Sequence, residues 1–170
     1  MIVNVFEFLN ELQSTCAPTI EGQLVWVPPM FASMQVFVFD DSWIEEEFNP
    51  FWWEYLAAYR SQQNQPLENN ARRGTCDEIA ERCRSHFAEA ARKFNGDVDC
   101  AAGAYFARIM LPAGGGLNNV PGPGGHEMII LATTKDQKTF KLHAYEAQNR
   151  LRTPLADAVA AGVVVRACWV

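Results

Sequence analysis

The sequence lacks several features that would point to particular classes of protein. It contains no run of Lys or Arg and carries a formal net charge of −6, so we expect no nucleic-acid partner and no anionic-membrane surface. No apolar stretch reaches the roughly 20 residues that cross a bilayer. The N-terminal segment MIVNVFEFLNELQ holds two glutamates and lacks the basic region of a signal peptide. These absences predict a cytoplasmic protein.

The cysteines are few, and their spacing argues against a disulfide framework and against a metal site. No CxxC pair occurs, which favours a reducing compartment over a disulfide framework. Cys76, Cys83 and His86 could suggest a metal site, since Cys83 and His86 share a helical face, but no second pair has ligand spacing, so we expect no metal and no cofactor. The glycines of 112–125 lack the order of a nucleotide-binding loop. The five cysteines are Cys16, Cys76, Cys83, Cys100 and Cys168.

Apolar residues, by contrast, are abundant. The 170 residues are 49% hydrophobic and include 11 Phe and 5 Trp, which is enough for one domain with a sizeable core. Helical patterns come first, a cysteine-headed helix follows, and strands dominate the remainder. This order predicts an α+β fold rather than alternating βαβ units. We expect a single domain over 1–170.

Periodicity and turn residues predict the individual elements. Asp40, Asp41 and Ser42 form a cap before a helix that starts near Trp43, and Pro50 breaks or restarts that helix. A later helix has Thr153 as N-cap, Pro154 as its first residue and Gly162 as C-cap. The loop 112–125 is of the long kind that is often functional. Helices are expected over 4–13, 51–60, 76–94 and 153–162, strands over 23–27, 34–39, 103–111 and 163–170, a β-hairpin over 126–148, and loops over 61–74 and 112–125.

Cys76 stands at the start of the best-patterned helix. Thr75 and Glu78 match a capping box, which makes Thr75 the N-cap and Cys76 the first helical residue. Free N–H groups and the helix dipole there favour the thiolate, while Asp77 and Glu78 oppose it in part. Two interpretations are open: Cys76 is a nucleophile, or it is a small apolar residue on the buried face. Cys83, further along, is expected in the core.

A nucleophilic cysteine needs a base, and the hairpin offers one. If the turn is Lys135–Gln137, His126 lies directly opposite Glu146, on the same side of the sheet. A carboxylate there would orient the imidazole, and Gln148 is a rival for that task. A purely structural His–Glu hydrogen bond is the alternative. The face that His126 and Glu146 would end is otherwise apolar and holds Met128, Ile130, Phe140, Leu142 and Ala144.

Taken together, these segments resemble a known superfamily. A cysteine at a helix start, then a hairpin opening with histidine and returning to a polar residue, is similar to the papain-like and transglutaminase-like thiol enzymes. TCDEIA is similar to the CDDFA segment of small papain-like proteins of phages and bacteria. HEMIIL is similar to their HAxNV strand, and YEAQNRLRTPLADAVAAG to their EPQTG strand end and trailing helix. The match covers 74–165, whereas the first 70 residues carry no such motif. The departures are Glu127, Ala147 and Asn149, where the family has a small residue, proline and threonine.

The resemblance implies a papain-like fold in which the cysteine-headed helix packs on an antiparallel sheet. It implies Cys76 as nucleophile, His126 as base, and Glu146 or Gln148 as the orienting residue. Asn69 or Asn70 resembles the upstream amide of an oxyanion hole. The expected activity is that of a thiol hydrolase or acyl/amide transferase acting on a peptide, amide or ester. The alternative is a non-catalytic binding or structural module, of the phage-associated kind, that retains the fold.

Overall fold

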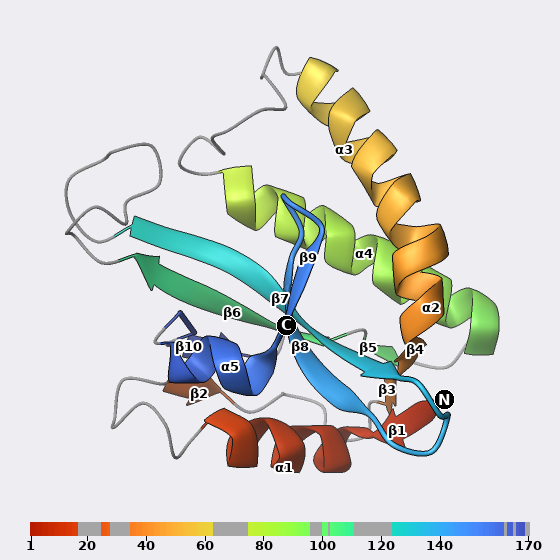
Figure 1. Ribbon diagram of the computed structural model, residues 1–170, viewed down its shortest axis with the longest axis vertical. Helices are drawn as coiled ribbons and strands as arrows, with labels where there is room; N and C mark the ends of the chain where they lie inside the picture. Colours follow the sequence, from red (N-terminus) through yellow and green to blue (C-terminus); the bar gives the residue numbers. More distant parts are fainter. Residues whose placement is uncertain are drawn as a thin grey trace.

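The structure is a computed structural model (Figure 1). The described residues form both helices and β-sheets, so the predicted mixed α+β class is confirmed. Of the helices among them, none combines the length and the hydropathy needed to cross a bilayer. The described ranges are 1–16, 25–27, 35–62, 75–95, 100–101, 103–110, 124–161, 163–164 and 166–168.

Two sheets occur within these ranges. The larger has seven strands in the order β2-β10-β6-β7-β8-β9, with β4 placed beside β7. Its central strands β6 to β9 are antiparallel neighbours, whereas β2 runs parallel to β10 and β4 runs parallel to β7. Its strands are β2 (Val25–Val27), β4 (Phe39–Asp40), β6 (Gly103–Met110), β7 (Gly124–Thr134), β8 (Lys141–Glu146), β9 (Leu151–Pro154) and β10 (Arg166–Cys168). The smaller sheet comprises β1 (Ile2–Asn4), β3 (Gln35–Phe37) and β5 (Cys100–Ala101).

Helices cover both faces of the larger sheet. In Figure 1, α1 and α5 lie below it and α3 and α4 lie above it. Because side chains alternate along a strand, each face buries every second residue of β7 and β8. The helices are α1 (Val5–Cys16), α2 (Asp41–Trp43), the π-helical turn η1 (Ile44–Phe48), α3 (Asn49–Gln62), α4 (Thr75–Asn95) and α5 (Leu155–Ala160).

The two faces build two separate clusters of buried side chains. Met128, Ile130, Leu142 and Ala144 pack against α1 and α5, which confirms the predicted membership of that face. The opposite face supplies other residues to α3 and α4, namely Ile129, Leu131, Tyr145 and Ala147. The cysteine-headed helix α4 therefore covers the face opposite to the one that the sequence singled out.

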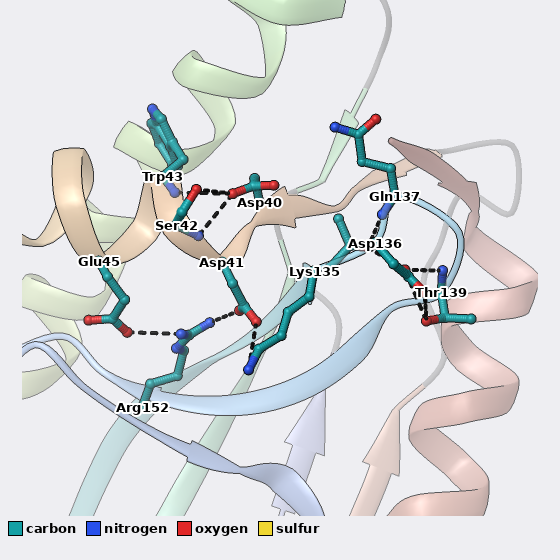
Figure 2. Close-up of polar contacts among 11 residues, drawn as sticks. Asp40, Asp41, Ser42, Trp43, Glu45, Lys135, Asp136, Gln137, Thr139 and Arg152 are labelled. Carbon is teal, nitrogen blue, oxygen red and sulfur yellow. Dashed lines mark hydrogen bonds and ion pairs between the residues drawn. The ribbon is translucent and has the colours of Figure 1, made fainter.

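The hairpin register differs from the prediction by two residues. Ile129 pairs with Tyr145 and Ile130 pairs with Ala144. The connection is longer than a three-residue turn because the Asp136 carboxylate accepts the backbone N–H groups of Lys138 and Thr139, each at 3.0 Å. Figure 2 shows Asp136 facing Thr139 across this turn. The alternation of faces is preserved, but the direct pairing of His126 with Glu146 was wrong.

The predicted helix over 153–162 was wrong at its start. Thr153 and Pro154 belong to β9, where they pair with Ala144 and His143, and Pro154 is the N-cap residue of α5. Proline is tolerated at this position because β9 lies at the edge of the sheet. Gly162, the predicted C-cap, lies outside the described residues.

Several other boundaries of helices and strands differ from the prediction. The strand expected over 34–39 is divided at Val38 into β3 and β4, which join different sheets. Asp40 caps α2 as predicted, since its carboxylate accepts the N–H groups of Ser42 and Trp43. The prediction that Pro50 breaks or restarts the helix was wrong, because α2, η1 and α3 follow one another without a break and Pro50 lies in the first turn of α3. Of the two expected loops, Ser61 and Gln62 belong to α3 and Gly124 and Gly125 belong to β7; the remaining loop positions lie outside the described residues.

Candidate active site

Cys76 is the second residue of α4, which begins at Thr75, one residue earlier than predicted. Its side chain is 8% exposed, and Cys83 is fully buried at 0%. The prediction that Cys83 is a core residue is thus confirmed. Both side chains are thiols rather than disulfide partners. The position of Cys76 in the first helical turn is therefore as expected, and most of its surface is covered by the protein.

The solvent side of the first turns of α4 carries a charged pair. Arg82 lies 3.3 Å from the carboxylate of Glu78, and its guanidinium stacks over the ring of Tyr59 at 4.6 Å. Glu78 was expected to oppose a thiolate at Cys76. Because an opposite charge is held beside it, its field at the helix start is reduced.

His126 lies on β7, with its backbone opposite Arg108 of β6. Its side chain is outside the described part of the structure. β7 is the strand against which α4 packs, and in Figure 1 the start of α4 and the start of β7 lie toward the same side of the molecule. The elements that carry the predicted nucleophile and base are thus neighbours in the fold.

The predicted orienting residues lie where β8 ends. Glu146 is the last residue of β8, and Gln148 follows in the turn that leads to β9. Both side chains are buried, Glu146 at 7% and Gln148 at 3% exposure. The Nε2 atom of Gln148 is buried and, within the described residues, has no hydrogen-bond partner. Counted on from the pair of Ile129 with Tyr145, position 148 and not 146 corresponds to His126, although β8 itself ends at Glu146 and Gln148 lies in the turn.

Helix α3 holds the end of β8 in place. The Trp52 indole donates a 2.6 Å hydrogen bond to the Ala147 carbonyl, and the Tyr145 hydroxyl donates one of 2.6 Å to Oδ1 of Asn49. The guanidinium of Arg150 lies 4.9 Å from the centre of the Trp53 ring. The sequence predicted a helix over 51–60 but none of these contacts. The tryptophans and tyrosines of this helix were a signal for such contacts, since buried Trp and Tyr need partners for their polar atoms.

A second polar cluster lies beside β8 and β9. Arg152 pairs with the carboxylates of Asp41 and Glu45, and Lys135 reaches Asp41 at 3.9 Å; Figure 2 shows Arg152 between the two carboxylates. Burial would raise the pKa of Asp41, but its hydrogen bonds and the charge of Arg152 outweigh this and lower it.

His143 lines a hollow of about 420 Å³ next to this cluster. Burial, with the positive charge of Arg152, lowers the pKa of His143 to about 4. Neither ring nitrogen of His143 has a hydrogen-bond partner among the described residues. His143 lies on β8 opposite Leu131, on a different face of the sheet from the Met128 side chain.

The other expected site features lie outside the described residues. This applies to Asn69, Asn70 and most of the glycine-rich loop. Within the described ranges, no group of three or more His, Cys, Asp or Glu side chains could hold a metal ion.

Comparison with models of known protein families finds no match, and comparison with curated proteins finds none either.

Proposed function

We propose that the chain is a thiol hydrolase or acyl/amide transferase of papain-like type. The observation that carries the proposal is the placement of Cys76 in the first turn of α4, a helix that packs on the strand bearing His126. Free N–H groups at a helix start favour a thiolate. The order of cysteine helix, histidine strand and polar strand end, as in the papain-like enzymes, supports it further.

In the proposed reaction, His126 accepts the thiol proton of Cys76 and the sulfur attacks an amide or ester carbonyl. The tetrahedral adduct collapses to a thioester, and His126 returns the proton to the leaving group. Water or an acceptor amine then attacks the thioester and releases Cys76. Each step transfers one proton through one imidazole and requires no cofactor.

Gln148 is the better candidate than Glu146 for the residue that orients His126. The strand register, extended from Ile129 and Tyr145, leads to Gln148. Its amide is also buried with an unused donor, and such a group is costly unless it acquires a partner. Trp52 and Asn49 fix the chain on either side of Glu146, which limits how far Gln148 can move.

The test is acylation of the full chain by p-nitrophenyl acetate, with peptide mapping by mass spectrometry. We expect a burst of one p-nitrophenolate per chain and acetyl on Cys76, both lost in Cys76→Ser. His126→Ala should slow the burst by about 100-fold or more. The proposal fails if Cys76 is acetylated no faster than a free model thiol at the same pH. Cys83, which is fully buried, is the internal control.

A non-catalytic module is the second candidate, and one observation favours it. Met128 and Ile130, whose alternation with His126 defined the predicted site face, pack against α1 and α5, while α4 covers the other face. In that case Cys76 is a packing residue. Cys76→Ala would then change the unfolding free energy, and neither the wild type nor the variant would release a burst of p-nitrophenolate.

A further inference from the structure

An aromatic hollow lies at the far end of α4 from Cys76. It has a volume of about 320 Å³ and is formed between the segment from α2 to α3 and the last turns of α4. Cys76 and Ala90 are 14 residues apart on α4, which is about 21 Å along a helix. The hollow is therefore separate from the proposed thiol site.

Aromatic rings form its walls. The Trp43 and Phe48 ring centres are 5.5 Å apart, those of Phe48 and Phe51 6.2 Å, and Trp43 meets Phe94 edge to face at 6.3 Å. The imidazole of His86 also lines the hollow and lies edge to face with Phe51 at 5.5 Å. Rings at several orientations thus surround one space.

Two of these rings are exposed to solvent. Phe51 is 47% exposed and Phe94 is 64% exposed, and both border the hollow. Large exposed aromatic side chains that gather around a concavity are typical of binding sites. Phe94 also stacks on Phe37, with ring centres 5.8 Å apart, and this contact supports its ring.

The charges at the rim favour a cation. Glu47 and Glu89 contribute carboxylates to the lining, and Lys93 contributes an ammonium that lies 3.6 Å from Glu89. Glu47 has no ion-pair partner among the described residues, so the rim retains a net negative charge. Burial lowers the pKa of His86, so its imidazole is uncharged at neutral pH and adds no repulsion.

We propose that this hollow binds a quaternary ammonium group, with the rings of Trp43, Phe51 and Phe94 around the cation and Glu47 at its edge. Aromatic faces attract cations, and a quaternary ammonium has no N–H donors that the apolar walls would leave unpaired. A primary ammonium is strongly hydrated and would lose more on entering. The volume is at the lower end of the range of small-molecule sites, which suits a trimethylammonium head with a short tail.

The experiment is calorimetric titration of the full chain with choline and with its neutral carbon isostere, 3,3-dimethylbutan-1-ol. We expect choline to bind about tenfold more tightly than the isostere, because only the cation gains from the rings and from Glu47. Tetramethylammonium should also bind, since the head alone makes these contacts. The quaternary ammonium group could belong to a free metabolite or to a modified lysine side chain. Comparison of the affinities for choline and for Nα-acetyl-Nε-trimethyllysine amide distinguishes these two sources.

Three variants test the site directly. Phe51→Leu and Glu47→Gln should each weaken choline binding about two- to fivefold, and Phe94→Leu provides a second ring deletion. Phe6→Leu is the matched control, because Phe6 is 56% exposed on α1. Equal affinity for choline and the isostere, no measurable binding of either, or equal weakening by Phe6→Leu would overturn the proposal. Cys76→Ala should leave choline affinity unchanged, so the result is independent of the thiol chemistry.

Discussion

The indole of Trp52 donates a 2.6 Å hydrogen bond to the carbonyl of Ala147, which lies 95 residues further along the chain. Both residues are buried, so water cannot replace the bond. It joins α3 to the point at which β8 ends and the chain turns toward β9. Through this bond an N-terminal helix positions the segment that holds Glu146 and Gln148.

Trp52→Phe should therefore lower the unfolding free energy by about 2–4 kcal/mol, because it leaves a buried carbonyl unpaired and removes part of a packed ring. Urea unfolding measures this loss. Trp53→Phe is the control, since Trp53 is only partly buried and a phenyl ring can still stack with Arg150; we expect a change of less than about 1 kcal/mol. Equal losses in the two variants would contradict a special role of the Trp52 bond.

Gln148→Met should affect the acetylation rate of Cys76 without lowering the unfolding free energy. The substitution removes a buried amide whose Nε2 lacks a partner within the described residues, so the unfolding free energy should be unchanged or rise by about 1 kcal/mol. If Gln148 orients His126, the acetylation rate of Cys76 should fall at least about tenfold in the same variant. Gln13→Met, at an exposed position of α1, should alter neither quantity. A destabilised Gln148→Met with an unchanged acetylation rate would assign Gln148 to packing alone.

His143 should make the protein less stable in acid. Its pKa is about 4 in the folded state and about 6.5 in an unfolded chain, so the unfolded state binds more protons between these values. Stability is therefore fully present above about pH 7 and decreases as the pH falls toward 4, by as much as about 3 kcal/mol. Urea unfolding across this range provides the measurement.

His143→Gln should flatten that pH dependence, because its side chain cannot take up a proton. The groups whose charges act on His143 are Arg152, Lys135 and Lys141, which lower its pKa, and Asp41, which raises it. His86→Gln is the comparison. Burial also lowers the pKa of His86, but His86 lies in another part of the fold. If wild type and His143→Gln follow parallel curves between pH 4 and 7, the assignment to His143 is incorrect.

Arg152→Lys should weaken the attachment of β9 to α2. The guanidinium contacts Asp41 with one nitrogen and Glu45 with another, and the single ammonium of lysine cannot reproduce that geometry. Because Arg152 and Asp41 are each only 14% exposed, we expect a loss of about 1–2 kcal/mol in the unfolding free energy. Arg92→Lys, at an exposed position of α4, should change it by less than about 0.5 kcal/mol. A loss of similar size in both variants would show that the ion cluster contributes nothing specific.

Local patterns in the sequence determined helices α1 and α4 and the composition of the sheet faces. The apolar spacing around Phe8, Leu12, Ile79 and Cys83 is a property of adjacent turns, so α1 and α4 could be predicted without knowledge of their neighbours. Alternation along β7 and β8 likewise predicted that Met128, Ile130, Leu142 and Ala144 share a face.

Only the tertiary structure decided what those faces meet and where the strands align. The register depended on the carboxylate of Asp136, which lengthens the turn by accepting two backbone N–H groups. Thr153 and Pro154 carry local signals for a helix start, but pairing with β8 placed them in a strand. Both faces of β7 are apolar, so the sequence could not tell which one α4 would cover. That choice arises from contacts between distant segments, such as Trp52 with Ala147, whose strength depends on burial that only the folded chain provides.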